Sequence, residues 1–350
     1  MGSDKLMIGA QMEDATATAA PFDARYIYLA GGIAPSASCM TSCSSACGAW
    51  WGCWQDHSQA PGMFASYHLE RAASAMWQNV SRPQAPVFTY YEILNSAGVG
   101  EGAAEVAAIN DAAFLARYFD DWRFLLQKIG PARAMLHIEP DFWGYVRLVN
   151  SNPHAVPAPV AVANPTDCGG QEGSAAGFAR CLIAMVRKYA PNATVGLHAS
   201  PWLSHMSGDG AAVGNFMLAL GAAEGDFVVT DPSDRDAGYY ASLGQDRWWD
   251  DARAAAYLSW SKSLSGVVGK PTVLWQLPLG NMAQNNTPNH WQDNRVDYLF
   301  AHLADVTSAR IVALLFGAGQ QDQTTPESDG GNLVAKTVAN WQAGGAPLCR

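Results

Sequence analysis

The chain has 350 residues, of which 49% are hydrophobic and 15% are charged, and its 31 acidic and 21 basic side chains give a net charge of −10. This composition is typical of a compact globular protein and excludes disordered and fibrous classes. The acidic balance and the lack of a Lys/Arg run argue against nucleic acid, which is bound through clustered cations. No apolar stretch of the sequence reaches the roughly 18 residues that a membrane span requires. We therefore expect no nucleic-acid partner and no membrane partner.

Eight short apolar segments recur along the chain, and they predict strands at residues 6–11, 24–30, 86–93, 132–139, 193–198, 226–231, 271–277 and 309–317. Apolar residues at helical spacing lie between them, at residues 110–129, 173–189, 210–223, 248–268 and 292–308. Helix-stop signals such as Gly130-Pro131 precede several of the strands. Alternation of this kind predicts parallel β/α units, and eight units predict a single (β/α)8 barrel of the TIM type.

We expect residues 6–350 to form one catalytic domain and residues 1–5 to be a remnant of expression. A doubly wound open sheet is the alternative fold. Such a fold commonly carries a G-x-G-x-x-G motif after its first strand, and this sequence has none there.

The chain has seven cysteines, whose arrangement bears on the cellular compartment of the protein. Four of them lie close together in one Ser- and Gly-rich segment after the second strand: Cys39, Cys43, Cys47 and Cys53. Their spacing does not fit zinc or iron–sulfur sites, and no histidine pair lies nearby. Disulfides that staple long loops are the better interpretation, and they predict a secreted or extracytoplasmic protein whose leader has been removed. Of the remaining three, Cys168 and Cys181 flank a loop and the start of a helix, and Cys349 either stays free or pairs with the 39–53 segment.

Functional residues of a (β/α)8 barrel lie at the carboxyl ends of its strands. At those positions this sequence supplies carboxylates, amides and large aromatic side chains. An aromatic ring covers the apolar face of a sugar, while carboxylates and amides bind its hydroxyl groups. Glycoside cleavage needs two carboxyl groups, about 5 to 5.5 Å apart for retention of configuration or about 6.5 to 9.5 Å apart for inversion. The pattern therefore predicts a site for carbohydrate.

We assign catalysis to Glu139 and Asp141 after the fourth strand, with Glu92 and Asp231 as partners across the barrel mouth. Contact with the sugar is assigned to further residues near strand ends: Tyr91, His137, Trp143, His198, Trp202, Trp275, Gln276, Trp291 and Asp322. We expect no cofactor and no metal ion. The alternative interpretation of His137 and His198 is a metal site shared with Glu139 or Asp141.

The segment Leu136-His137-Ile138-Glu139-Pro140 resembles the strand-four signature of a large clan of retaining (β/α)8 glycoside hydrolases, in which Asn-Glu-Pro carries the acid/base Glu. The resemblance implies that role for Glu139. Ile138 stands where the clan has Asn, and Gln276 stands where the clan has its nucleophilic Glu. The missing nucleophile favours inversion of configuration.

The string Ile138-Glu139-Pro140-Asp141 also resembles the Ile-Glu-Pro-Asp of family 6 cellulases, which implies an active-site role for Asp141. That family follows the motif with a helix and a flanking cysteine pair, the place of Cys168 and Cys181 here. Its general acid lies in an Asp-Arg-Asp-Cys motif on an earlier loop. The sequence from Tyr91 to Leu94 stands there instead, which implies that Glu92 takes the role.

These resemblances imply a distant or unassigned family of glycoside hydrolases. We expect a secreted, monomeric enzyme that cleaves a polysaccharide, with a β-glucan such as cellulose as the first candidate substrate. Two alternatives stay open. One is a noncatalytic carbohydrate-binding barrel in which Gln276 marks a lost nucleophile. The other is a metal-dependent hydrolase or deacetylase that uses His137, His198 and the neighbouring carboxylates.

Overall fold

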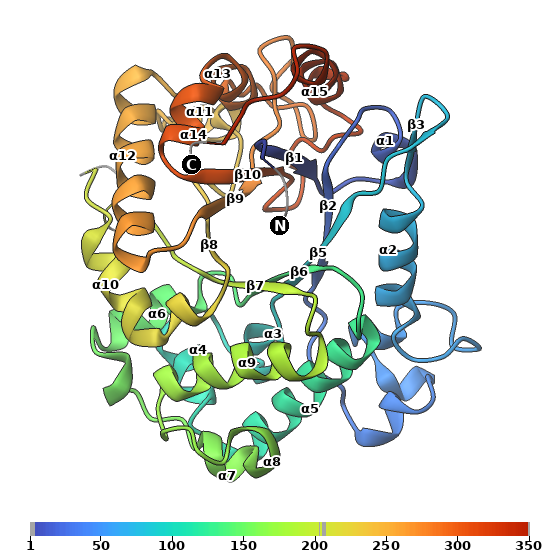
Figure 1. The fold of residues 1–350 in the computed structure, drawn as a ribbon, viewed down its shortest axis with the longest axis vertical. Helices are drawn as coiled ribbons and strands as arrows, with labels where there is room; N and C mark the ends of the chain where they lie inside the picture. The colour runs from blue at the N-terminus through green and yellow to red at the C-terminus, as the bar shows by residue number, and fades with distance from the viewer. Residues whose placement is uncertain (1–3, 203, 205–207, 349–350) are drawn as a thin grey trace.

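A computed structural model describes residues 4–202, 204 and 208–348. Eight parallel strands close into a barrel in the order β1-β10-β9-β8-β7-β6-β5-β2 (Figure 1). The strands are β1 (Met7–Ala10), β2 (Ala24–Leu29), β5 (Ala85–Tyr90), β6 (Met135–Ile138), β7 (Thr194–His198), β8 (Phe227–Thr230), β9 (Thr272–Leu277) and β10 (Ile311–Phe316). Seven of them lie within the predicted apolar segments and β5 begins one residue before its segment, so the predicted (β/α)8 barrel is confirmed. A separate hairpin pairs β3 (Met76–Trp77) with β4 (Val80–Ser81).

Helices surround the barrel, as Figure 1 shows. They are α1 (Asp14–Ala17), α2 (Met63–Ala73), α3 (Ile93–Ala97), α4 (Ala103–Ala108), α5 (Ala112–Ile129), α6 (Phe142–Val149), α7 (Val160–Ala163), α8 (Pro165–Cys168), α9 (Ala175–Tyr189), α10 (Ala211–Leu220), α11 (Ala237–Ser242), α12 (Asp251–Val268), α13 (Arg295–Ala301), α14 (Leu303–Ser308) and α15 (Asn332–Gln342). The helix predicted at 292–308 is divided at His302, whose Nδ1 lies 2.8 Å from the carbonyl oxygen of Tyr298. The prediction of one continuous helix in this segment was therefore wrong, because the structure has two helices there.

Local signals explain where the long helices begin. The Asp111 carboxylate accepts hydrogen bonds from the backbone N–H groups of Ala113 and Phe114 at 2.7 and 3.2 Å, and α5 ends at Gly130. The Ser174 and Asp250 side chains cap α9 and α12 in the same way. Such caps satisfy backbone donors that have no partner within the helix.

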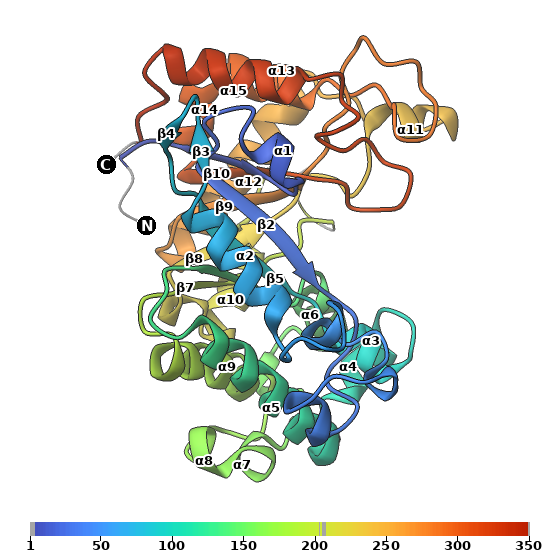
Figure 2. The same ribbon diagram turned by 90° about the vertical axis from the view of Figure 1, so that its right-hand side faces the viewer.

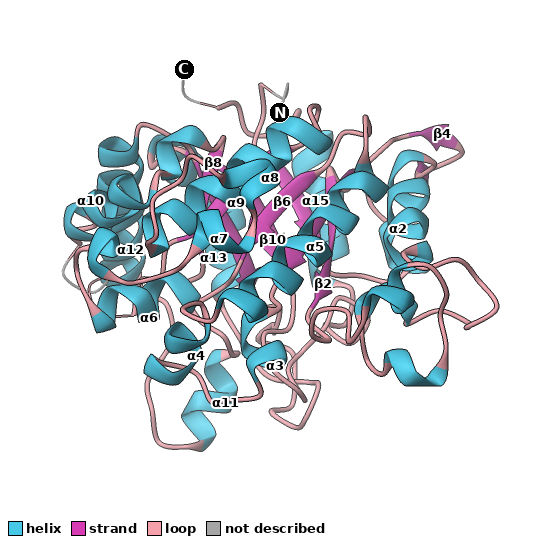
Figure 3. Cartoon of the chain, turned by 90° about the horizontal axis from the view of Figure 1, so that it is seen from below, coloured by secondary structure: helices cyan, strands magenta, loops and turns pink. Residues whose placement is uncertain are grey.

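The two ends of the barrel differ. Figures 2 and 3 show both chain termini at one end and α3, α4 and α11 at the other. Near the termini, Lys5 pairs with Pro347, and the Leu348 N–H donates to the Asp4 carbonyl. The strands point away from this end, so their carboxyl ends lie beside α3, α4 and α11, and the loops there form the functional face.

The barrel interior is filled by alternating residues of the strands. A cluster that includes Met7, Tyr26, Val87, Phe227 and Trp275 occupies its centre. A larger apolar layer packs between the strands and the helices outside. The interior is therefore a packed core, and side chains meet solvent only at its rim.

The cysteine-rich loop after β2 carries two disulfides, Cys39–Cys47 and Cys43–Cys53, which confirms the predicted stapling. Because the four cysteines pair among themselves, the alternative link from Cys349 to this segment is wrong; Cys349 itself lies outside the described residues.

Asp121 on α5 fixes this loop to the barrel. Its carboxylate accepts hydrogen bonds from the indole N–H groups of Trp50 and Trp51, the hydroxyl of Tyr90 and the backbone N–H of Ala34. Burial raises the pKa of Asp121 to about 6, although these four donors favour the charged form.

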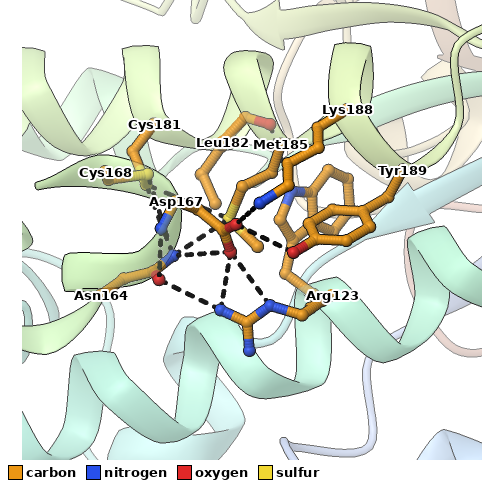
Figure 4. Close-up of a disulfide and its surroundings, with 10 residues drawn as sticks. Arg123, Asn164, Asp167, Cys168, Cys181, Leu182, Met185, Lys188 and Tyr189 are labelled. Carbon is orange, nitrogen blue, oxygen red and sulfur yellow. Dashed lines mark hydrogen bonds and ion pairs between the residues drawn. A yellow bond between two sulfur atoms is a disulfide. The ribbon is translucent and has the colours of Figure 1, made fainter.

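A third disulfide, Cys168–Cys181, joins α8 to α9, and a charged cluster lies against it (Figure 4). The buried carboxylate of Asp167 accepts hydrogen bonds from Arg123, Lys188 and Tyr189. These donors lower the pKa of Asp167 to about 2 despite its burial.

No helix among the described residues is long and apolar enough to cross a membrane.

Candidate active site

A cleft of about 790 Å³ opens at the carboxyl ends of the strands. Aromatic side chains from several loops line it, among them Tyr28, Tyr145, Trp202, Trp249 and Trp275. Its volume lies within the range of about 300 to 1,000 Å³ that is usual for ligand sites.

Asp141 lies on this cleft, three residues beyond the end of β6. Its backbone has a φ of 63°, a left-handed conformation that is rare and strained for a residue with a side chain. The indole N–H of Trp202 donates a hydrogen bond of 3.0 Å to its carboxylate. Loss of hydration raises the pKa of Asp141 to about 6, against the opposing attraction of His198, and the nearby Asp231 charge raises it further.

Asp231 directly follows β8 and faces Asp141 across His198. The Nε2 atom of His198 lies 3.2 Å from Asp231 Oδ1 and 3.9 Å from Asp141 Oδ1. One oxygen of each aspartate and one nitrogen of His198 all lie within 4.8 Å of one another. The His198 side chain is fully buried, whereas those of Asp141 and Asp231 are 33% and 13% exposed. The two carboxylates can therefore both reach a bound molecule.

A row of buried polar groups continues beneath them into the barrel. His198 Nδ1 lies 3.1 Å from His137 Nε2, and His137 Nδ1 lies 3.3 Å from the hydroxyl of Thr89. Burial lowers the pKa of His137 well below its ordinary value, and the neighbouring His198 lowers it further. The contact between His137 Nε2 and His198 Nδ1 leaves His198 Nε2 facing the aspartates.

Gln276 and Trp275 from β9 complete the floor of the cleft. The hydroxyl of Tyr28 donates a hydrogen bond of 2.9 Å to Gln276 Oε1, which leaves the amide N–H₂ of Gln276 as a donor. Gln276 has a φ of 54°, another left-handed residue at a strand end. Trp275 packs edge-on against His137 at 4.7 Å between ring centroids.

One wall of the cleft is organised by Glu101. Its carboxylate accepts hydrogen bonds from the hydroxyls of Tyr91 and Tyr145 at 3.2 and 2.8 Å. The Tyr145 ring packs on Trp202 at 4.8 Å between centroids. The chain of contacts therefore runs from Glu101 through two aromatic rings to Asp141.

Glu139, to which the sequence assigned catalysis, does not line the cleft. It is fully buried, and its φ of 48° directs the carboxylate into the layer between the barrel and α5. There it accepts hydrogen bonds from the Tyr118 hydroxyl at 2.6 Å and the Glu92 N–H at 3.1 Å. Burial raises the pKa of Glu139 to about 8, so it carries a proton at neutral pH.

Glu92, predicted as a catalytic partner across the barrel mouth, is also buried behind the rim and does not line the cleft. It lies close to Asp121 and Glu139. Burial raises its pKa well above the ordinary value, and these two acidic neighbours raise it further. Glu92 directly precedes α3, and its side chain is fully buried.

Three more predicted sugar contacts lie elsewhere. Trp143 is fully buried, and its N–H donates to the Ile138 carbonyl at 3.1 Å. Trp291 is 8% exposed and donates to the Asp322 carbonyl at 2.8 Å. Neither Trp291 nor Asp322 lines the cleft. Of the predicted residues, the cleft lining contains Asp141, Asp231, Tyr91, Trp202, Trp275 and Gln276, with His137 and His198 beneath them.

Sequence reasoning missed several residues that line the cleft: Tyr28, Glu101, Tyr145, Asp234, Tyr240, Asp246, Arg247 and Trp249. Tyr28 has a signal in the sequence, because it alternates with Ala24 and Tyr26 on one face of β2. Glu101 has none, since it lies in the glycine-rich loop from Gly98 to Gly102.

The trio of Asp141, His198 and Asp231 offers two carboxylate oxygens and an imidazole nitrogen, a donor set that divalent transition metals accept. The other ring nitrogen of His198 contacts His137, at the position where a metal-bound histidine usually donates to a carboxylate, a backbone carbonyl or water. The same atoms are also placed for proton transfer, so the geometry is compatible with metal binding and with acid–base catalysis.

No protein-family model and no curated protein sequence matches this chain. Among solved structures, an endo-β-1,4-mannanase double mutant from Cellulomonas fimi matches 96% of this chain and 70% of its own, with 11% identity and a TM-score of 0.54. A family 5 cellulase described as Bacteroidetes-affiliated matches 97% of this chain and 92% of its own, with 8% identity and a TM-score of 0.52. At such identities the likeness establishes the fold alone.

A partial match pairs the chain with an endoglucanase from Mycobacterium tuberculosis at 15% identity. It covers 61% of this chain and 56% of that one, so this chain spans little more than half the length of the endoglucanase. The TM-score of 0.33 is too low to indicate a common fold.

Proposed function

We propose that the protein is a glycoside hydrolase that cleaves a polysaccharide, with Asp141 and Asp231 as its two catalytic carboxyl groups. The observation that carries the proposal is their arrangement: both face one aromatic-lined cleft, and one oxygen of each lies within 4.8 Å of the other. Glycoside cleavage requires such a pair with different protonation states.

Asp141 is the proposed general acid. Its raised pKa of about 6 keeps a large fraction protonated in mildly acidic solution. The proton passes from Asp141 to the glycosidic oxygen as the bond to the anomeric carbon breaks. Trp202, whose indole N–H donates to Asp141 Oδ1, holds this carboxyl group in place.

Asp231 is the proposed second carboxylate, and His198 stabilises its charge at 3.2 Å. The approach of the two aspartates within 4.8 Å is close to the spacing of about 5 to 5.5 Å in retaining enzymes. We therefore replace the expectation of inversion with direct attack by Asp231 on the anomeric carbon. Water then hydrolyses the glycosyl-enzyme with Asp141 as the base.

The fold supports this proposal, because the barrels it matches are named as a mannanase and a cellulase. A β-linked glucan such as cellulose is the proposed substrate, and the enzyme is proposed to act as a monomer. Three disulfides favour a secreted or extracytoplasmic location, since such bonds persist in oxidising compartments.

The test is release of reducing ends from a panel of glucans, xylans and mannans by the wild type, Asp141→Asn and Asp231→Asn. Release by the wild type and its loss in both variants, with folding intact, supports the proposal. Binding without release on every substrate would instead support the noncatalytic barrel. Release that a chelator abolishes and added zinc restores would support the metal-dependent alternative, which the Asp141, His198 and Asp231 trio favours.

A further inference from the structure

A second hollow, of about 600 Å³, adjoins the cleft at the same end of the barrel. The segment after β1, strand β2 and the loop after β10 form it. It shares three lining residues with the cleft, namely Tyr28, Gly319 and Gln320. The two hollows are therefore neighbours across a common boundary.

Gly319 lies on that boundary and is tightly packed there. A Cβ atom at this position would overlap the side-chain nitrogen of Gln276 and the carbonyl oxygen of Asp234. Any larger residue would therefore displace Gln276 from the cleft floor. Glycine at this position therefore permits the close approach of Gln276 and Asp234 where the cleft and the second hollow adjoin.

The chemistry of the second hollow suits an uncharged, hydroxyl-rich ligand. The side-chain amides of Gln11, Gln320 and Gln321 line it, and each amide can both donate to and accept from a hydroxyl group. None of the described lining residues is a lysine or arginine, while Glu13 and Glu327 contribute negative charge. The Glu327 carboxylate accepts a hydrogen bond from the Glu13 backbone N–H, which closes the outer edge.

We propose that this second hollow binds further sugar units of the same neutral polysaccharide chain whose scissile bond lies between Asp141 and Asp231. The inference rests on the proposed function for the identity of the ligand. It assigns to Gln11 and Gln321 the binding of the part of the polysaccharide that extends beyond the cleft. Neither residue takes part in bond cleavage.

The test measures binding apart from turnover. Calorimetry with Asp141→Asn determines its affinity for β-1,4-linked gluco-oligosaccharides of two to six units, with the matching manno-oligosaccharides as a second series. Affinity is expected to rise with chain length. Adding Gln11→Ala and Gln321→Ala is expected to weaken binding of the longest oligosaccharides about thirtyfold while leaving the shortest unchanged, because the two lost hydrogen bonds together contribute about 2 kcal/mol and about 1.4 kcal/mol is a factor of ten. Gln342→Ala, an exposed amide at the end of α15, is the matched control.

An equal loss at every length, no loss at any length, or no binding by any oligosaccharide would overturn the inference. Failure of the proposed function has a different signature, since the wild type would then bind the same oligosaccharides without releasing reducing ends. In an active wild type, kcat/KM is expected to rise with chain length, and the two Gln→Ala changes together should remove that rise.

Discussion

Glu139 and Asp141 are separated by a single proline, yet their carboxyl groups lie on opposite sides of the barrel wall. Glu139 bonds to Tyr118 of α5 in the buried outer layer, whereas Asp141 bonds to Trp202 on the cleft. Both residues have positive φ values, of 48° and 63°. Two left-handed residues around Pro140 therefore decide which of the two acids meets a ligand.

This relationship gives opposite predictions for two conservative substitutions. Asp141→Asn is expected to lower kcat by about 10² to 10⁴-fold, the usual contribution of a general acid. Glu139→Gln is expected to keep activity within about tenfold of the wild type, because a protonated Glu139 and a glutamine are both neutral. Initial rates on the best substrate of the panel, with circular dichroism as the folding control, check both. A larger loss in Glu139→Gln than in Asp141→Asn would reverse the assignment.

The pH dependence of activity should reflect the protonation of the Asp141 carboxyl group. Since the acid must be protonated, kcat is expected to fall as pH rises through about 6. The Trp202 hydrogen bond favours the charged form of Asp141. Trp202→Phe should therefore move the fall in kcat to higher pH and also weaken binding of the sugar. Rate profiles from pH 4 to 9 measure both effects. If kcat fell at the same pH in Trp202→Phe as in the wild type, the proposed role of Asp141 would be contradicted.

Stability should also depend on pH, through carboxyl groups buried away from the cleft. Burial raises the pKa of Glu139 to about 8, and those of Glu105 and Asp236 to about 7. Between pH 4 and 8 these three groups bind more protons in the folded state than in the unfolded state, so through them the free energy of unfolding falls as pH rises. Thermal unfolding at pH 5 and pH 8 should give the higher midpoint at pH 5. Glu139→Gln should reduce the difference, and a higher midpoint at pH 8 would contradict the prediction.

Asp121 should be the most sensitive anchor of the cysteine-rich loop. Asp121→Ala removes the acceptor of four buried donors, including both Trp50 and Trp51, and is expected to cost about 3 kcal/mol or more. Asp121→Asn keeps one acceptor oxygen and should cost less. Denaturant unfolding measures both. Equal stability of Asp121→Ala and the wild type would show that the loop is held by its disulfides alone.

The sequence by itself determined the barrel, because parallel β/α units leave a periodic apolar pattern that needs no long-range information. It also located Asp141, Asp231 and Trp202, since the carboxyl ends of parallel strands converge at one rim. The stapled loop followed from crowded cysteines. Their pairing within the loop required the folded chain, because four cysteines allow several connectivities.

Only the tertiary structure decided which side chains at the rim meet the cleft. Glu139, with its left-handed backbone, and Glu92, directly before α3, are both buried, although they adjoin apolar strands just as Asp231 does. Glu101, in contrast, reaches the cleft from a loop without any local pattern, through bonds to Tyr91 and Tyr145. Side-chain direction at a strand end depends on φ and on contacts between segments distant in the chain, and neither is encoded in the periodicity that defines the strand.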